Sequence, residues 1–502
     1  MAQAYPTAGE TDDSQEGQIR FSERYAALRG RVMREETDSS PHGPEQAFHG
    51  VWYDQLFSET GLCTDEGMPI RIVSPGWWNH GEGPDFKGAQ IEFAGTVKTG
   101  DVELHIEHSG WRRHGHHLDA RYDGVVLHVV LDAEPAREPP VTSLGRRVPT
   151  LSLGRFVSRD VLELGEAPDA GDFSCDGGAL APRGQCAAAA FGRDRIGAFL
   201  DFAGDWRTLT RARLLRERAD RVGMDQAVYE AVLSACGFSR YKSHFRLIAQ
   251  QLPYDRARQL ARQDPLLLET ALLQLAGLLP ESLPEGTTAV PHFARLRALR
   301  RDHVPGLKKL PLSWRRIGVR PTNFPERRLA GAALFLSRTA PEGLAATLDR
   351  IWRAECSDKE RCAEFEALFP AAMGFWASHC SWTGKKLARP MSTIGHARIQ
   401  SIIGNVFIAA ELALARQARN RSLEAEVFRF FCHFPKEAEN RIIKDMTTRL
   451  FGRDPVPGLR FRRQQGLLQM HQDWCCSNPA CVDCPVLPLL AAPTIAREQI
   501  PS

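Results

Sequence analysis

The sequence lacks several features that would assign its class at once. It contains no run of about eighteen apolar residues, the length that a membrane-spanning helix needs. Its first residues, MAQAYPTAGETDDSQEGQ, have neither the basic start nor the apolar core of a secretory signal. It also lacks an exact internal repeat and a large net charge, which is only +3. We therefore expect a cytoplasmic protein without membrane contacts, whose oligomeric state stays open.

Composition and length indicate a folded protein of several domains. Of its 502 residues, 43% are hydrophobic and 25% are charged, which is typical of globular proteins. The polar segment 1–44 is predicted to be a disordered tail. We expect a β-rich domain over 45–184, a helical domain over 185–465 and a cysteine-rich loop over 466–502. The predicted fold class is therefore α+β.

The β-rich segment shows the alternation of apolar and polar residues that strands require. Turns are expected at Gly81–Gly83 and Thr99–Gly100. Val125–Leu131 is almost continuously apolar, as in a strand buried on both faces. The predicted alternating strands are Pro69–Ser74, Gln90–Phe93 and Asp101–Glu107.

The second half has apolar residues at spacings of three and four, the period of amphipathic helices. The segment Trp314–Arg328 is interrupted by two prolines, so we expect an extended connector that opens onto a helix near Pro325. The predicted helices are Asp194–Asp220, Asp225–Gln251, Pro265–Leu278, Arg328–Ser337 and His396–Gln417.

Histidines and acids are concentrated between Gly81 and Leu131. Imidazole and carboxylate groups together can bind divalent metals, and histidine is the usual general base near neutral pH. The stretch therefore holds the candidate site. Its histidines are His105, His108, His114, His116, His117 and His128. Its acids are Asp85, Glu92, Asp101, Glu103, Glu107, Asp119 and Asp123.

Short motifs along most of the chain resemble an uncharacterised bacterial family, domain of unknown function 2851. That resemblance runs from about residue 45 to 486 and implies no activity. The motifs are Val51-Trp52, GPDF at Gly83–Phe86, GDVELH at Gly100–His105, Trp111 with His114 and His116, Tyr122, LHVV at Leu127–Val130, RPTNFPERRLA at Arg320–Ala330, ARIQSIIGN at Ala397–Asn405 and the terminal cysteines.

A shorter segment is similar to PD-(D/E)xK nucleases, and implies a restriction-endonuclease-like domain. Pro84-Asp85 is followed by Glu103-Leu104-His105, with histidine where those enzymes have lysine. The resemblance implies that Asp85 and Glu103 hold magnesium, manganese or zinc. Strand alternation places His105 on the same face as Glu103, as base or third ligand. His114 and His116 would assist, and Glu92 or Asp101 could replace Glu103.

Eleven Lys or Arg residues stand between Arg295 and Arg328, against two acids. Such a segment suits the phosphate backbone of DNA or RNA, although a solvated basic face would look the same. Arginine and asparagine in a loop suit phosphate contacts in particular. The candidate nucleic-acid-binding residues are Arg315, Arg316, Arg320, Asn323 and Arg327.

Four cysteines near the end predict a structural metal site, with zinc or a [4Fe–4S] cluster. They are Cys475, Cys476, Cys481 and Cys484. The segment is similar to the iron–sulfur loop of endonuclease-III-like glycosylases, but no cysteine follows the last one. His471 or Cys432 could then supply a ligand in place of one of an adjacent pair.

Three functions are consistent with these features. The first is a metal-dependent nuclease or phosphodiesterase acting on nucleic acid. The second is a non-catalytic nucleic-acid-binding protein whose metals are structural. The third is a metal-dependent hydrolase of a small molecule, which would have no affinity for polyanions.

Overall fold

The computed structural model has two compact units, each assembled from separate parts of the chain. One contains Pro41–Ala181 and Arg218–Val406, and the other contains Met1–Ser40, Pro182–Glu217 and Phe407–Ser502. The structure describes residues 48–49, 51–52, 57, 61–79, 83–135, 139–157, 186–284, 287–310, 312, 314, 316, 319–370, 374–452, 456, 458–475, 484 and 486–491. The predicted tail over 1–44 lies outside these ranges.

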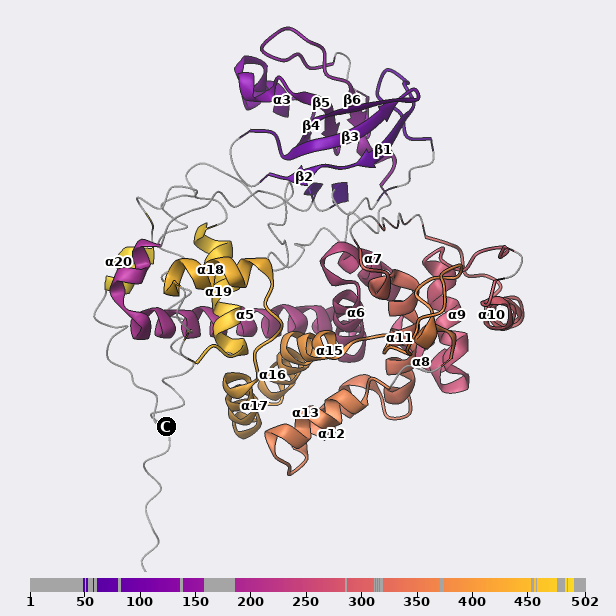
Figure 1. The fold of residues 1–502 in the computed structure, drawn as a ribbon, viewed down its shortest axis with the longest axis vertical. Coiled ribbons are helices and arrows are strands. Elements are labelled where there is room, and N and C mark those ends of the chain that lie inside the picture. Colours follow the sequence, from indigo (N-terminus) through magenta and orange to yellow (C-terminus); the bar gives the residue numbers. More distant parts are fainter. Residues whose placement is uncertain are drawn as a thin grey trace, which may run out of the picture. The chain divides into compact units, whose positions relative to one another are not determined.

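A six-stranded mixed sheet forms the β-rich part, which Figure 1 draws in indigo and violet. The strand order is β1-β3-β4-β5-β6, and β2 pairs with β3. The expected α+β class is confirmed by this sheet together with the helical remainder of the chain. The strands are β1 (Ile70–Ser74), β2 (Trp77–Trp78), β3 (Phe86–Phe93), β4 (Thr96–His105), β5 (Val125–Val130) and β6 (Thr150–Ser152).

The hairpin between β3 and β4 turns at Ala94 and Gly95. Both residues have positive φ, 46° and 88°, as the tight turns that match the twist of a hairpin require. The turn predicted at Thr99–Gly100 is therefore wrong, because these residues lie inside β4 and pair with β3. A Thr-Gly dipeptide is typical of turns, but here it lies in a strand that is exposed over its first four residues.

The second half of the sheet is parallel, and this arrangement brings the histidines together. Strand β4 pairs in parallel with β5, and β5 pairs in parallel with β6. The return from β4 to β5 consists of α3 (Gly110–Arg113) and the 3₁₀ turns η1 (His116–Leu118) and η2 (Ala120–Tyr122). This return segment lies at the C-terminal end of β4.

One face of β4 and β5 contributes to the hydrophobic core of the sheet. Val102 and Leu104 from β4 and Leu127 and Val129 from β5 are at most 1% exposed and belong to one cluster. Since side chains alternate along a strand, the residues between them point to the opposite face. That opposite face carries Glu103, His105 and His128.

Helices make up the rest of the described chain, as the sequence predicts. The predicted helix over Asp225–Gln251 is broken at Gly237, and α11 begins at Pro325 as expected. The helices are α5 (Arg193–Val222), α6 (Met224–Cys236), α7 (Phe238–Gln251), α8 (Tyr254–Gln263), α9 (Pro265–Leu275), α10 (Val290–His303), α11 (Pro325–Thr339), α12 (Leu344–Arg353), α13 (Asp358–Ala367), α14 (Phe375–Ser378), α15 (His396–Ile402), α16 (Ile408–Gln417), α17 (Arg421–His433), α18 (Arg441–Phe451), α19 (Phe461–Met470) and α20 (Val486–Ala491). Shorter turns are η3 (Leu153–Arg155), η4 (Ala187–Phe191), η5 (Pro321–Asn323), η6 (Ile403–Phe407) and η7 (His471–Cys475).

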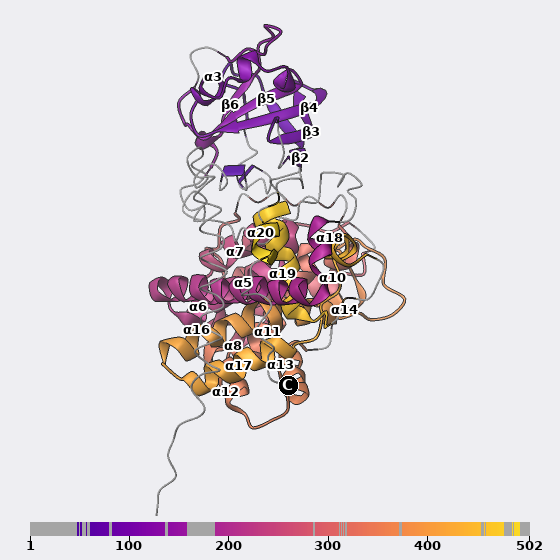
Figure 2. The same cartoon turned by 90° about the vertical axis from the view of Figure 1, so that its left-hand side faces the viewer.

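Helices α5 and α19 pack closely in the second unit, where Figures 1 and 2 both draw them side by side. A Cβ on Gly466 would lie 2.0 Å from the carbonyl oxygen of Leu200, so only glycine fits there. Arg462 donates to both carboxylate oxygens of Asp205 at 2.7 and 2.6 Å. The pair is buried, and its two parallel hydrogen bonds fix how the helices cross.

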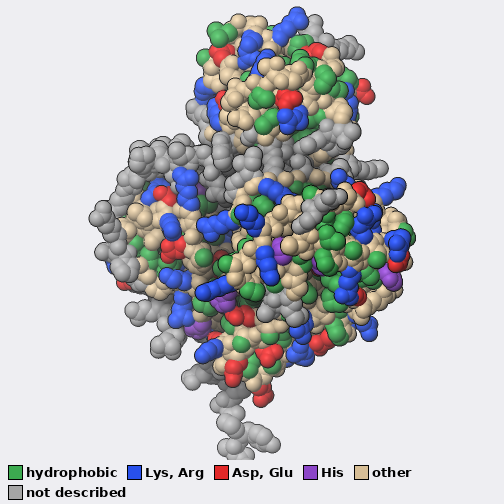
Figure 3. Space-filling model, turned by 45° about the vertical axis from the view of Figure 1, so that its right-hand side comes forward, with side chains coloured by type: hydrophobic (Ala, Val, Ile, Leu, Met, Phe, Trp, Pro, Cys, Tyr) green, Lys and Arg blue, Asp and Glu red, His purple; other side chains and the backbone are tan. Residues whose placement is uncertain are grey.

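One described helical run, His396–Gln417, is long and apolar enough to cross a membrane. Its mean hydropathy is 1.3, and 67% of the window is buried inside the protein, as in a core helix. Figure 3 shows Lys and Arg side chains spread over the helical part of one face.

Candidate metal centre

The end of β4 positions the first two polar groups of the site. Glu103 and His105 are 5% and 1% exposed, although both side chains are polar. Glu103 Oε1 and His105 Nε2 are 3.8 Å apart, which confirms that the two residues share a face of the strand. Buried polar groups need partners, and the return segment from β4 to β5 supplies them.

The return segment folds back over His105 because of Gly110. A Cβ at this position would lie 2.4 Å from His105 Cδ2, so glycine allows α3 to lie directly against the ring. His114, just after α3, then places Nδ1 3.2 Å from His105 Nε2. His116 opens η1, where its ring stacks on Tyr122 at a centroid distance of 3.8 Å.

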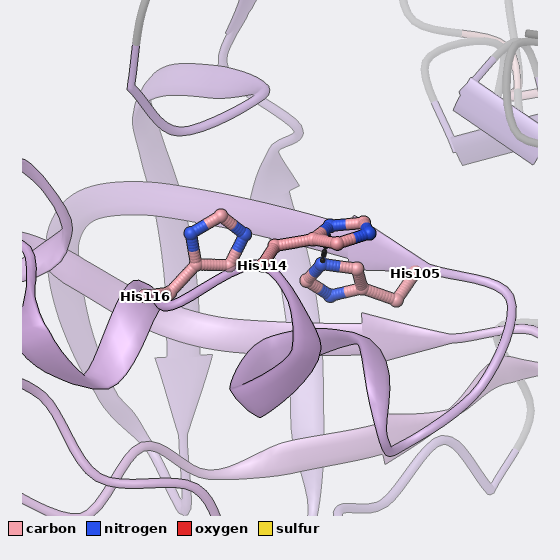
Figure 4. Close-up of side chains that lie close together, drawn as sticks. All are labelled: His105, His114 and His116. Carbon is pink, nitrogen blue, oxygen red and sulfur yellow. Dashed lines mark hydrogen bonds between the residues drawn. The ribbon is translucent and has the colours of Figure 1, made fainter. Parts of the chain in front are cut away.

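His105, His114 and His116 form a group that could hold a metal ion. One ligand nitrogen from each lies within 4.8 Å of the others. Figure 4 shows the three rings gathered between the strand end and the return segment. Two nitrogens bound to one tetrahedral zinc ion lie about 3.4 Å apart, since each Zn–N bond is about 2.0–2.1 Å. The 3.2 Å between His105 and His114 is close to this value.

Two carboxylates lie beside the three rings. Glu103 Oε1 is 3.0 Å from His116 Nε2, so it could serve as a fourth ligand. Asp85 is held by the strand itself, because its Oδ2 accepts the Leu104 N–H at 2.9 Å. The Asp85 N–H in turn donates to Glu103 Oε2 at 3.0 Å. His49 Nε2 approaches Asp85 Oδ2 at 3.3 Å.

His128 and Thr150 support His105 from behind. The parallel register pairs Glu103 with His128, so His128 lies on the same face of the sheet. Its Nε2 is 3.0 Å from His105 Nδ1, and Thr150 Oγ1 is 3.5 Å from its Nδ1. If His105 binds a metal through Nε2, its proton is on Nδ1 and is donated to His128. Such outer partners fix the tautomer of a ligating histidine.

Burial keeps the imidazoles of His105, His116 and His128 neutral. Desolvation is the largest cause that lowers the pKa of His116 to about 4 and that of His128 to about 3. The pKa of His105 falls further for the same reason, and the neighbouring histidines lower it too. A neutral ring has a lone pair on one nitrogen, which is the form that binds metals. Desolvation also raises the pKa of the Tyr122 hydroxyl, so that group stays protonated.

The structure brings together all five residues predicted for the catalytic site: Asp85, Glu103, His105, His114 and His116. It also adds His128 and His49, which are not among these five. His128 is a buried, hydrogen-bonded strand histidine, and its relation to His105 follows only from the β4–β5 register. His49 lies two residues before the Val51-Trp52 motif, and no sequence pattern indicated a role for it.

Several of the predicted nucleic-acid contacts are used inside the protein. Arg327 is 1% exposed and donates to the carbonyl oxygens of Trp376, Ser392 and Met391. The predicted contact of Arg327 with phosphate does not fit this geometry, because the guanidinium already donates its hydrogen bonds to these carbonyl groups. Arg316 pairs with the buried Glu326, and Asn323 accepts a hydrogen bond from Arg328. Arg320 is exposed, and Arg315 lies outside the described residues.

The cysteine site stays a prediction. Cys475 ends η7, and Cys475 and Cys484 are both half-buried against a hydrophobic cluster. Cys476 and Cys481 lie outside the described residues. His471, the alternative ligand, is buried at the start of η7.

The fold and the site define an α+β protein with a histidine-rich candidate metal centre beside two carboxylates. The chain belongs to a family described as protein of unknown function (DUF2851), whose model matches residues 45–440. This range includes the sheet and all the histidines of the centre. No curated protein and no solved structure matches the chain.

Proposed function

We propose that the protein is a metal-dependent hydrolase that cleaves phosphodiester bonds in nucleic acid. The observation that carries the proposal is the convergence of three imidazoles and Glu103 at the end of β4. This donor set favours zinc or manganese over magnesium, which prefers six oxygen ligands. A bound ion of this kind would supply Lewis acidity and lower the pKa of a coordinated water.

The exposure of the group favours a catalytic over a structural role. His105 and His116 are buried, but His114 is exposed to solvent. Structural zinc sites are usually closed by four protein ligands, whereas catalytic sites have three and leave one position for water or substrate. When Glu103 contacts His116 instead of the ion, a centre held by three histidines leaves one position open on the exposed side next to His114.

Asp85 accepts a backbone hydrogen bond from Leu104, and we expect it to act in the reaction beside the ion as well. It is 22% exposed at its side chain and contacts His49. Together they form a carboxylate–imidazole pair next to the three rings. The spacing of Pro84-Asp85 and Glu103-Leu104-His105, which is similar to that of PD-(D/E)xK nucleases, supports a phosphodiester substrate. The Lys87 ammonium group could in principle contact a phosphate, but it pairs with Asp101 at 3.3 Å.

Elemental analysis of the purified protein tests the metal, and a nuclease screen tests the activity. We expect the wild-type protein to contain close to one zinc or manganese ion at this centre. The His105→Ala and His116→Ala variants should lose that ion. Cys481→Ser should keep it, even if the cysteines hold a separate metal that this variant loses. Cleavage of labelled DNA or RNA should disappear with the same histidine variants. A wild-type protein that takes up neither metal at this site, even when dialysed against it, would refute the proposal.

A further inference from the structure

Four arginines of the basic segment between residues 295 and 328 form ion pairs within the fold. Three of them on α10 make ion pairs: Arg295 with Asp264, Arg300 with Glu281, and Arg301 with Asp302. Arg316 and Arg327 are engaged as described above. The net charge of this segment therefore overstates the number of cations that are available to bind a partner.

A different set of cations is left exposed. Within the part of the chain that the structure describes, they make no ion pair with an acidic side chain. They come from two places, α10 with the loop after it and the loop after α14. The residues are Arg297, Lys308, Lys309, Lys385, Lys386 and Arg389.

Trp382 connects these two places. Its indole N–H donates to the carbonyl oxygen of Leu278 at 2.8 Å, just beyond the end of α9. Its ring also packs edge-on against Phe293 of α10 at 5.9 Å. The Arg297 guanidinium lies over the same Phe293 ring, 5.6 Å from its centroid. Lys385 and Lys386 follow Trp382 by three and four residues.

Lys309 reaches the same place from the loop after α10. Its aliphatic stem lies against Gly277, where a Cβ would be 2.5 Å from Lys309 Cε. The Leu310 N–H donates to the Leu275 carbonyl oxygen at 2.8 Å, which fixes the loop on the end of α9. The C-terminal end of a helix carries partial negative charge, so cations gather there at little cost.

We propose that these six cations, called here the α9-end surface, bind the phosphate backbone of a nucleic acid. Among the described residues these six cations form no ion pair with an acidic side chain, and they are spread over one helix and two loops, as suits a polyanion rather than a single small ligand. Figure 3 shows Lys and Arg side chains over the helical part of the molecule. For the identity of the partner, this inference rests on the proposed function.

The size of the expected effect can be stated as the salt dependence of the affinity for nucleic acid. Each phosphate that a protein neutralises on duplex DNA contributes about −0.9 to the slope of log K against log salt. Six contacts would therefore lower affinity by about 10³ between 50 and 200 mM salt. Removing two of the lysines should flatten the slope by about 2 and weaken binding to all sequences alike.

The experiment is fluorescence anisotropy on a labelled duplex DNA and a labelled single-stranded RNA, in EDTA, across a range of salt. The protein carries His105→Ala and His116→Ala, so that neither cleavage nor metal uptake affects the result. Lys308→Ala with Lys309→Ala, and Lys385→Ala with Lys386→Ala, should each flatten the slope. The matched control, Lys359→Ala with Lys444→Ala, removes two exposed lysines from α13 and α18 and should leave the slope unchanged.

Two results would overturn the inference: loss of slope in the control pair as large as in the test pairs, or no nucleic-acid binding at low salt. Binding that appears only on vesicles of phosphatidylcholine and phosphatidylserine would also overturn it, in favour of a lipid surface. The proposed hydrolase fails separately, if the histidine centre takes up no metal while the lysine-dependent slope persists.

Discussion

Replacing Gly110 with alanine tests whether His105 is a metal ligand. The new Cβ would lie 2.4, 2.5 and 2.8 Å from three carbon atoms of His105, whereas carbon atoms in contact lie about 3.5–4.0 Å apart. Either the ring or α3 must therefore move by about 1 Å. Alanine ordinarily stabilises a helix by about 0.5–1 kcal/mol relative to glycine. Overpacking costs about 1–3 kcal/mol, so a net loss of stability of about 1–2 kcal/mol is expected.

Metal affinity should fall more clearly than stability. A shift of about 1 Å is large against a Zn–N bond of about 2.0–2.1 Å, and changes to the groups that orient a ligand cost about 10–100-fold in affinity. We expect a loss of this size for Gly110→Ala in competition with a zinc indicator. Chemical denaturation of the metal-free protein gives the stability change.

Two comparisons make this result interpretable. A Cβ on Gly306 would meet nothing within 4 Å, so Gly306→Ala should bind zinc as the wild type does. His114→Ala removes a ligand without a clash and should lower affinity while changing stability little. If Gly110→Ala binds zinc with wild-type affinity, then His105 is not a ligand and the reasoning from its ring position fails.

Three further predictions follow from the same structure. Thr150→Val should lower zinc affinity about 10-fold or more, because His128 loses the partner that helps to fix its tautomer, and Thr150→Ser should restore it. The metal-free protein should lose stability as the pH falls from 6.5 towards 3, measured by thermal unfolding. The reason is that burial lowers the pKa of His116 to about 4 and of His128 to about 3, from 6.5, so the unfolded chain binds more protons in this range. Gly466→Ala should destabilise the second unit by about 1–3 kcal/mol in chemical denaturation, since its Cβ would be 2.0 Å from the Leu200 carbonyl oxygen.

Each of these has an outcome that would contradict it. Equal zinc affinity in Thr150→Val and wild type would mean that the His128 contact does not orient His105. Stability that stays constant or rises between pH 6.5 and 3 would show that the buried histidines accept protons in the folded state. A Gly466→Ala protein as stable as the wild type would mean that α5 and α19 separate there without cost.

The sequence predicted much of the fold because its signals were local. Alternation located β1, β3 and β4, and the apolar run located β5. Helical periodicity located α5, α9 and α11, with the proline at the start of α11 as a further signal. Strand β6, Thr150–Ser152, has three residues and was missed because so short a strand shows no period.

The candidate site was predictable in part for the same reason. Glu103 and His105 share a strand face, and His114 and His116 follow within a short return segment. The role of His128 depends on the parallel pairing of β4 and β5, which no local pattern encodes. The sequence also could not show which cations of the basic segment are paired, because ion pairs such as Arg300–Glu281 form only when distant residues meet.

The parallel step from β4 to β5 has a consequence for folding. Glu103, His105, His114 and His116 lie within fourteen consecutive residues, so a nascent chain could bind an ion before β5 has joined the sheet. The contact from His128 forms only after β5 pairs with β4. Metal affinity would then rise in two stages, and the second stage would report the moment at which β5 pairs with β4.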